Sequence, residues 1–209
     1  TLFAQWESVD YELTIDPNGG TWKGSTNIQI EKGNYNTTKS IENPVAPEGY
    51  KVTLNNNDGT GTTLTQIQSK KFNGWQQSIG GNLSGTTYTF GTSNETITAT
   101  YEPESIELPT PTRTGYTFDG WYTSNEGGTK VNQQYMPIED TTLYAHWNAN
   151  TYTITFKDGD TTIGTKDVTN EQSYGDLPEP TKTGYTFKGW YTQNEGGDKI
   201  EETTTVDLV

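Results

Sequence analysis

The chain has 209 residues and a formal net charge of −14, and it contains no Cys and a single His. This charge repels phosphate groups and anionic lipids, and the Cys and His content excludes thiol catalysis, disulfides and zinc sites built on Cys. We therefore expect no nucleic acid partner, no membrane insertion, no metal site and no cofactor. Only 28% of the residues are hydrophobic but 12% are aromatic, which favours several small folded units, β-rich and α+β at most, over a disordered chain.

Residues 1–9 are predicted to be the last strand of an upstream repeat. An Ala-x-Trp motif at Ala4 and Trp6 precedes an alternating apolar stretch at residues 11–15, and the same arrangement recurs 141 positions later. A strand without its own unit can join the sheet of another molecule. One expectation is therefore head-to-tail self-association through residues 1–6, and the alternative is a frayed end.

Residues 10–101 are predicted to be a divergent repeat with an insertion at about residues 50–71. A Phe-x-Gly-Trp motif at residues 72–75 recurs 46 positions later, and residues 97–101 match residues 143–147 at the same offset. Trp22 and Trp75 lie outside the strict motif or in this divergent unit. We expect these two side chains to be exposed, where an indole face could stack on a sugar and bind a ligand.

Residues 102–149 are predicted to be a second repeat. Residues 111–130 are identical to residues 180–199 at 16 of 20 positions, an offset of 69. Alternating residues at 142–147 predict the last strand of this repeat. No full hairpin precedes the motif, so residues 102–149 are either a separate repeat or are fused with 10–101 as one domain.

Residues 150–209 are predicted to be a third repeat that lacks its last strand. Alternation predicts strands at 152–156 and 162–169, joined by a turn at 158–160. Two prolines limit residues 174–180 to a short helical turn or a rigid crossover. Residues 185–191 predict a third strand, in which a glycine before Trp190 introduces a bulge.

The repeated motif resembles one known family. The residues that carry the resemblance are Gly115, Tyr116, Phe118, Gly120, Trp121 and Trp147, and again Gly184, Tyr185, Phe187, Gly189 and Trp190. Their pattern resembles the Listeria/Bacteroides repeat, the internalin-type B-repeat family of bacterial surface proteins, closely over 102–209 and more loosely over 1–101. The resemblance implies tandem β-grasp-like modules with antiparallel sheets and short crossovers, on extracellular proteins that are secreted or attached to the cell wall.

The motif aromatics are expected to form the cores, because a small unit poor in Leu and Ile needs its large rings. The oxygen-rich turns lack the spacing of a calcium loop, and no carboxylate pair lies in an apolar stretch. We therefore predict no metal-binding and no catalytic residue. A Lys–Asn cross-link inside a domain stays open, because no spacing singles out a pair.

These patterns predict a non-catalytic stalk or adhesive spacer of a bacterial surface protein. Tandem units contact mainly their neighbours, so neighbouring repeats are the expected partners. The alternative is a binding module for a host glycoprotein or glycan.

Overall fold

The computed structural model describes residues 1–78 and 82–207, and these residues form strands, turns and loops but no helix. Accordingly, the described part of the chain has no helix of the length and apolarity that crossing a membrane requires. The chain divides into two compact units: residues 1–53, 64–108 and 133–141 form unit 1, and residues 54–63, 109–132 and 142–209 form unit 2. The predicted β-rich fold is confirmed.

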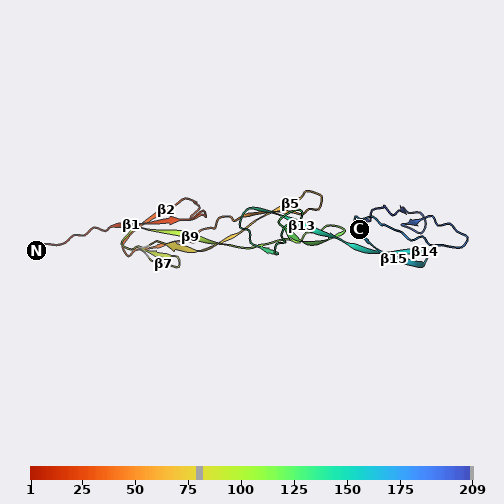
Figure 1. The fold of residues 1–209 in the computed structure, drawn as a ribbon. Coiled ribbons are helices and arrows are strands. Elements are labelled where there is room, and N and C mark those ends of the chain that lie inside the picture. The colour runs from red at the N-terminus through yellow and green to blue at the C-terminus, as the bar shows by residue number, and fades with distance from the viewer. Residues whose placement is uncertain (79–81, 208–209) are drawn as a thin grey trace. The chain divides into compact units, whose positions relative to one another are not determined.

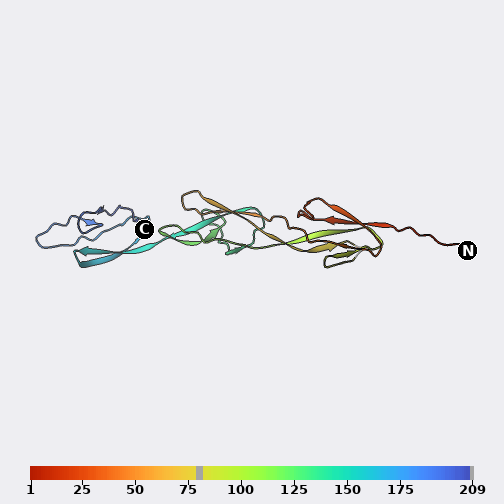
Figure 2. The ribbon, with the colours of Figure 1, turned by 180° about the vertical axis from the view of Figure 1, so that it is seen from behind.

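Unit 1 is built on a four-stranded sheet in the order β2-β1-β9-β6. Figure 1 labels β1, β2 and β9, and Figure 2 shows the chain from behind. Its strands are β1 (Asp10–Asp16), β2 (Gln29–Asn34), β6 (Lys70–Gln77) and β9 (Glu95–Pro103). The pair β1–β9 is parallel, and the pairs β1–β2 and β6–β9 are antiparallel. A three-stranded sheet combines β3 (Thr38–Ser40), β8 (Thr87–Thr89) and β7 (Asn82–Ser84), and β10 (Ile106–Glu107) pairs with β12 (Gln134–Tyr135).

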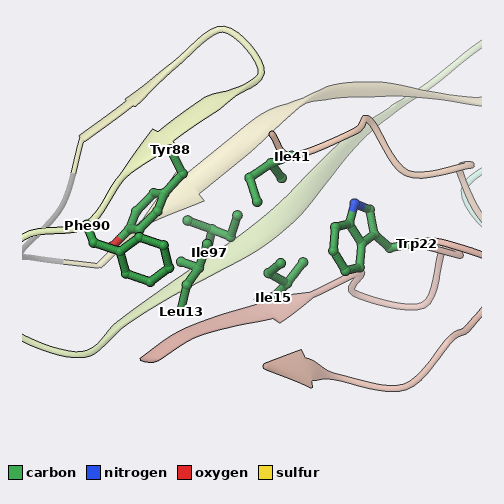
Figure 3. Packing of buried hydrophobic residues seen from close by; sticks show 7 residues of the cluster. All are labelled: Leu13, Ile15, Trp22, Ile41, Tyr88, Phe90 and Ile97. Atoms are coloured by element: carbon green, nitrogen blue, oxygen red, sulfur yellow. The ribbon is translucent and has the colours of Figure 1, made fainter. Parts of the chain in front are cut away.

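The core of unit 1 lies on one face of its larger sheet. Alternation sends Leu13 and Ile15 of β1 to the same side as Ile97 of β9. The rings of Tyr88 and Phe90 lie beside Leu13, and Trp22 lies beside Ile15 (Figure 3). Burying each such side chain contributes about 1.5 to 3 kcal/mol, so this cluster is the main source of cohesion in the unit.

A second four-stranded sheet has the order β11-β13-β4-β5. Its strands are β4 (Lys51–Asn55), β5 (Thr63–Ile67), β11 (Tyr116–Tyr122) and β13 (Thr141–Ala149), so the predicted insertion supplies two of them. The hairpin of β14 (Thr151–Asp158) and β15 (Thr161–Thr169) follows, and then the short pair β16 (Trp190–Tyr191) and β17 (Lys199–Ile200). The hairpin and the last strand of the second repeat agree with the sequence predictions.

One local prediction fails. The strand expected over residues 185–191 forms only at Trp190–Tyr191, because no described residue pairs with it in the way that β13 pairs with β11. Residues 1–9 are exposed and form no strand within this chain, and their role as the last strand of an upstream repeat stays a prediction. Residues 174–180 contain no helical turn, in keeping with the other alternative, a crossover. Parts of the predicted first and third repeats, residues 79–81 and 208–209, lie outside the described residues.

Candidate functional site

The Phe-x-Gly-Trp motif forms the same aromatic pair at each of its three positions. The ring centroids of Phe and Trp lie 5.5 Å apart in the first motif (Phe72–Trp75), 5.7 Å in the second (Phe118–Trp121) and 5.3 Å in the third (Phe187–Trp190). The interplanar angles are 65°, 68° and 65°, the edge-to-face arrangement that aromatic quadrupoles favour. The four-residue motif therefore forms the same Phe–Trp ring geometry at all three places in this chain.

The glycine of the motif makes this geometry possible. The strand register shifts between Phe72 and Gly74 and again between Phe118 and Gly120, as a β-bulge requires. Gly74 has φ 131° and Gly189 has φ 122°, a backbone region that side chains rarely tolerate. A bulge thus occurs in the first two motifs, where none was predicted. At Gly189, where a bulge was predicted, the structure has a backbone conformation like that of Gly74 but no register shift among the described pairs.

Two lysines that sequence analysis missed each cover one of these glycines. A Cβ added at Gly120 would lie 2.4 Å from Cε of Lys130, and one added at Gly189 would lie 2.7 Å from Cε of Lys199. The lysine stems therefore occupy the space that the absent side chains leave. The signal was available, because these lysines match at the offset of 69.

The indole N–H groups are anchored to main-chain carbonyls twelve residues earlier. Nε1 of Trp121 donates to the Pro109 carbonyl at 2.7 Å, and Nε1 of Trp190 donates to the Pro178 carbonyl at 2.8 Å. Nε1 of Trp75 is buried and finds no partner among the described residues. The first motif therefore keeps the ring pair without the anchor.

The last strand of a repeat adds a third ring to the pair. Trp147 of β13 lies 5.4 Å from Phe118, and Tyr101 of β9 lies 6.1 Å from Phe72, both between centroids. In the third motif no such strand is present among the described residues, and Phe156 of β14 packs on Trp190 instead, at 4.7 Å. Trp121 is 2% exposed, whereas Tyr185 is 75% exposed.

One main-chain hydrogen bond recurs at equivalent positions of the sequence. The N–H of Glu104 donates to the Ser69 carbonyl, and the N–H of Asn150 donates to the Gly115 carbonyl, each at 2.9 Å and 46 positions apart in sequence. We call the second contact, with the residues around it, the Gly115 junction. A Cβ at Gly115 would lie 2.4 Å from the Asn170 amide, so glycine allows this close approach.

Charged and aromatic side chains complete the Gly115 junction. The guanidinium of Arg113 lies 3.7 Å above the Tyr116 ring, and Glu171 accepts a hydrogen bond from the Tyr116 hydroxyl. This bond to a carboxylate, followed by partial burial, raises the pKa of Tyr116 above its ordinary value. The junction therefore joins the start of β11 to the turn after β15.

The structure does not bring the two predicted ligand-binding residues to one site. Trp22 is 1% exposed, so the expectation of an exposed ring is wrong: its ring packs in the core of unit 1 and its Nε1 donates to the Glu42 carbonyl at 2.9 Å. A ring without a free face cannot stack on a sugar. Trp75 is half-buried and packs against the same core.

A hollow of about 290 Å³ lies elsewhere on unit 1, lined by residues 46–48 and 67–70. Tyr50 is exposed next to it, and its N–H lies 3.4 Å from the side-chain oxygen of the buried Gln68, which lines the hollow. The ammonium of Lys70 lies 6.0 Å from the Tyr50 ring centroid. Sequence analysis missed this place, because these residues match nothing in the other repeats.

A polar cluster on the second repeat has the residue types of a catalytic site but is internally satisfied. Asp119 accepts hydrogen bonds from Tyr122 and Lys130, which in this order lower the pKa of Asp119. The His146 ring stacks on Tyr122 at 3.9 Å between centroids. Within residues 1–78 and 82–207, no three His, Asp or Glu side chains gather closely enough to hold a metal ion.

Several known proteins are similar to this chain in sequence. Internalin H of Listeria monocytogenes serovar 1/2a is 47% identical over 104 residues, which cover 48% of this chain and 19% of the relative. Two proteins of Evansella cellulosilytica, both named as membrane proteins, are 35% identical over 104 residues and 28% identical over 222 residues. These alignments cover 43% and 96% of this chain, and 12% and 32% of the relatives. The chain thus spans less than a third of the length of each of these relatives.

No solved structure matches the chain. The model of the Listeria-Bacteroides repeat domain matches twice, over residues 82–146 and 152–208, which together make up more than half of the sequence. Each match contains one Phe-x-Gly-Trp motif with its bulge glycine and its anchored indole. The chain therefore belongs to the Listeria-Bacteroides repeat domain family.

Proposed function

We propose that the chain is a non-catalytic stalk or adhesive spacer segment of a secreted or cell-wall-attached bacterial surface protein. The observation that carries the proposal is the recurring hydrogen bond between consecutive repeats, from Glu104 to Ser69 and from Asn150 to Gly115. A connection that repeats with the sequence lets an array grow by adding units, each in contact with its neighbours. The family and the likeness to Internalin H support a place on the cell surface.

The same bonds support the proposed organisation of the chain. They cross the expected boundaries at 101/102 and 149/150, with residues 1–9 as the end of an upstream unit. Each repeat is then a β-grasp-like module, for which the β14–β15 hairpin followed by the third motif is the best example. The charge of −14 keeps neighbouring arrays apart and soluble.

The spacer proposal is tested by surface display. One, two or three tandem copies of the 209-residue chain are placed between a cell-surface anchor and a peptide epitope, and capture by antibody-coated beads is measured. We expect capture to rise with each copy, and to rise less for Gly/Ser linkers of equal residue number, whose span grows only as the square root of length. Capture that does not depend on copy number would overturn the proposal.

The second candidate function is binding of a host glycoprotein or glycan, and the hollow beside Tyr50 favours it. An exposed aromatic ring next to a carboxylate and an ammonium group is the chemistry that recognises a sugar. The test is a titration of the chain against a mucin and glycan array. Saturable binding that Tyr50→Ala abolishes, and that Tyr35→Ala at another exposed position leaves intact, would support this function.

A further inference from the structure

The four-stranded sheet of unit 1 consists of two antiparallel pairs that one parallel pair joins. β2 pairs with β1, and β6 pairs with β9, both antiparallel. Between them β1 and β9 run parallel, with Leu13 opposite Glu95 and Asp16 opposite Thr98. Among the residues that the structure describes, no other strand pairing in this sheet connects β1 and β2 with β6 and β9. A force that separates the two halves of the sheet therefore acts on the β1–β9 pair.

The direction of the chain decides how tension loads this pair. Tension along the backbone enters β1 at its first residue, Asp10, and leaves β9 at its last residue, Pro103. Because the strands are parallel, these two points lie at opposite ends of the pair, and the pull moves the strands in opposite directions along their own axes. All the hydrogen bonds between β1 and β9 then bear the load together.

An antiparallel hairpin is loaded in a different way. In β14–β15 the chain enters and leaves at the same end, where Thr151 lies opposite Thr169. Tension along the backbone therefore opens the hairpin from that end, and its hydrogen bonds break one after another. The parallel pair of unit 1 is thus the arrangement that resists tension better.

Side-chain hydrogen bonds extend the β1–β9 pair beyond both ends of its ladder. Before the first paired residues, the N–H of Glu12 donates to Oδ1 of Asn94 at 2.8 Å. After the last paired residues, the hydroxyl of Tyr101 donates to the carbonyl of Pro17 at 2.7 Å. These bonds join residues 82 and 84 positions apart, so they add to the resistance against sliding at both ends.

One face of the pair is closed to water. Leu13 and Ile15 of β1 and Ile97 and Ala99 of β9 are fully buried. The first three pack together in the core of the unit (Figure 3). Water can replace a strained hydrogen bond only where it has access, and hydrogen bonds are stronger in an apolar surrounding. Burial on this face therefore protects the bonds that would carry the load.

We infer that unit 1 has a further function, to resist tension, and that the parallel pair β1–β9 is a shear clamp that keeps the unit folded when the chain is pulled along its backbone. The inference rests on the proposed spacer function for the source of the tension, because a segment that links a cell to another surface is pulled from both sides. Forced unfolding is governed by the rate of unfolding and not by equilibrium stability. A small unit can therefore hold under load even where its equilibrium stability is modest.

Single-molecule force measurements on the whole chain test the clamp by changing the direction of the pull. The chain has no Cys, so two introduced Cys residues at exposed positions define the attachment points. Val9→Cys with Ser105→Cys pulls β1 and β9 lengthwise past each other. Val9→Cys with Tyr35→Cys peels β1 from β2 at their adjacent ends, where Asp10 lies opposite Asn34. At the same loading rate, we expect the lengthwise pull to need a force several times higher, and equal forces would overturn the inference.

Variants of the flanking hydrogen bonds sharpen the test. Tyr101→Phe and Asn94→Ala remove the bonds at the two ends of the clamp, and each should lower the lengthwise force but not the peeling force. Asn34→Ala is the matched control, because it removes side-chain bonds between the start of β1 and the end of β2, to the Val9 carbonyl and to Asp10. It should lower the peeling force but not the lengthwise force.

The direction of the pull separates a clamp from a merely structural role. A variant that only destabilises the unit lowers its free energy of unfolding in denaturant and lowers both forces. A lengthwise force that Tyr101→Phe or Asn94→Ala leaves unchanged, or that Asn34→Ala lowers as much, would contradict the inference.

The force experiment and the display experiment fail independently. Capture that rises with copy number, together with a lengthwise force no higher than the peeling force, would reject the clamp and leave the spacer proposal intact. A high lengthwise force with capture that does not depend on copy number would support the clamp and reject the spacer.

Discussion

Residues 116–122 and 185–191 share six of seven residues and adopt different structures. The first segment is the regular strand β11, paired with β13, and the second is a strand only at Trp190–Tyr191. Both segments nevertheless form the same Phe–Trp ring pair and the same anchor to a proline carbonyl. Local sequence thus determines the aromatic motif, and the partner strand determines the extended backbone and the burial.

Removal of the motif tryptophan should cause the largest loss of stability, and the loss should differ between Trp121 and Trp190. Trp121→Ala is expected to cost about 3 to 5 kcal/mol of unfolding free energy, the range for a large buried ring, because Trp121 is buried and donates a hydrogen bond. Trp190→Ala should cost clearly less, because Trp190 is only half-buried. Chemical denaturation of both variants measures the difference, and equal losses would show that β13 does not determine burial.

Alanine at the junction glycines should have the next largest effect. Gly115 and Gly184 have φ 76° and 83°, so alanine at either position costs roughly 1 to 2 kcal/mol through the backbone. Only Gly115→Ala also forces Asn170 to move, so it should lose more stability than Gly184→Ala. Denaturation of the pair isolates this contact, and identical losses would argue against a tight Gly115 junction.

Asp119→Lys makes the two segments identical in sequence. It therefore tests whether residue 119 or the partner strand β13 causes the difference in their backbone structure. The variant loses the hydrogen bonds from Tyr122 and Lys130 to Asp119 on the exposed surface, so we expect a small loss of stability. Hydrogen exchange should still show protected amides along β11, because β13 is unchanged. Loss of that protection would assign the difference to residue 119 instead.

The smallest expected effect is a dependence on alkaline pH at the Gly115 junction. The hydrogen bond to Glu171 raises the pKa of Tyr116 above its ordinary value of 10.0, so the folded state holds this proton more tightly than the unfolded state. The contribution of the Tyr116–Glu171 hydrogen bond to stability is complete below pH 10 and declines as the pH rises further. Tyr116→Phe should remove this part of the decline, and Tyr185→Phe serves as the matched control in denaturation series at rising pH.

Sequence reasoning works where the determinants are local. The strands β14 and β15 and the turn between them follow from alternation and glycine placement in one continuous stretch of the sequence. The prolines and the lysines that complete the motif also recur at the offset of 69. Only the structure, however, shows what they contact.

The remaining features depend on contacts that no local pattern reveals. Trp22 has no counterpart in the other repeats, yet its ring is buried with Ile15 and Ile41 and its N–H reaches a carbonyl 20 residues away. Residues 185–191 have the alternation of a strand, but a strand also needs a neighbour. Burial and pairing are tertiary properties, so an isolated tryptophan and an unpaired segment are both misjudged.

The parallel pairing of β1 with β9 has a consequence for how the chain acquires its structure. The N–H of Glu12 bonds to Asn94 across 82 positions, so the core that Leu13 and Ile15 form cannot close until the ribosome has also made β9. The β14–β15 hairpin needs only the two residues between Asp158 and Thr161, and hairpins of this kind close in about 1 to 10 microseconds. The core of unit 1 therefore completes its folding slowly and the β14–β15 hairpin forms quickly, since non-local pairings must overcome the entropy of closing a long loop.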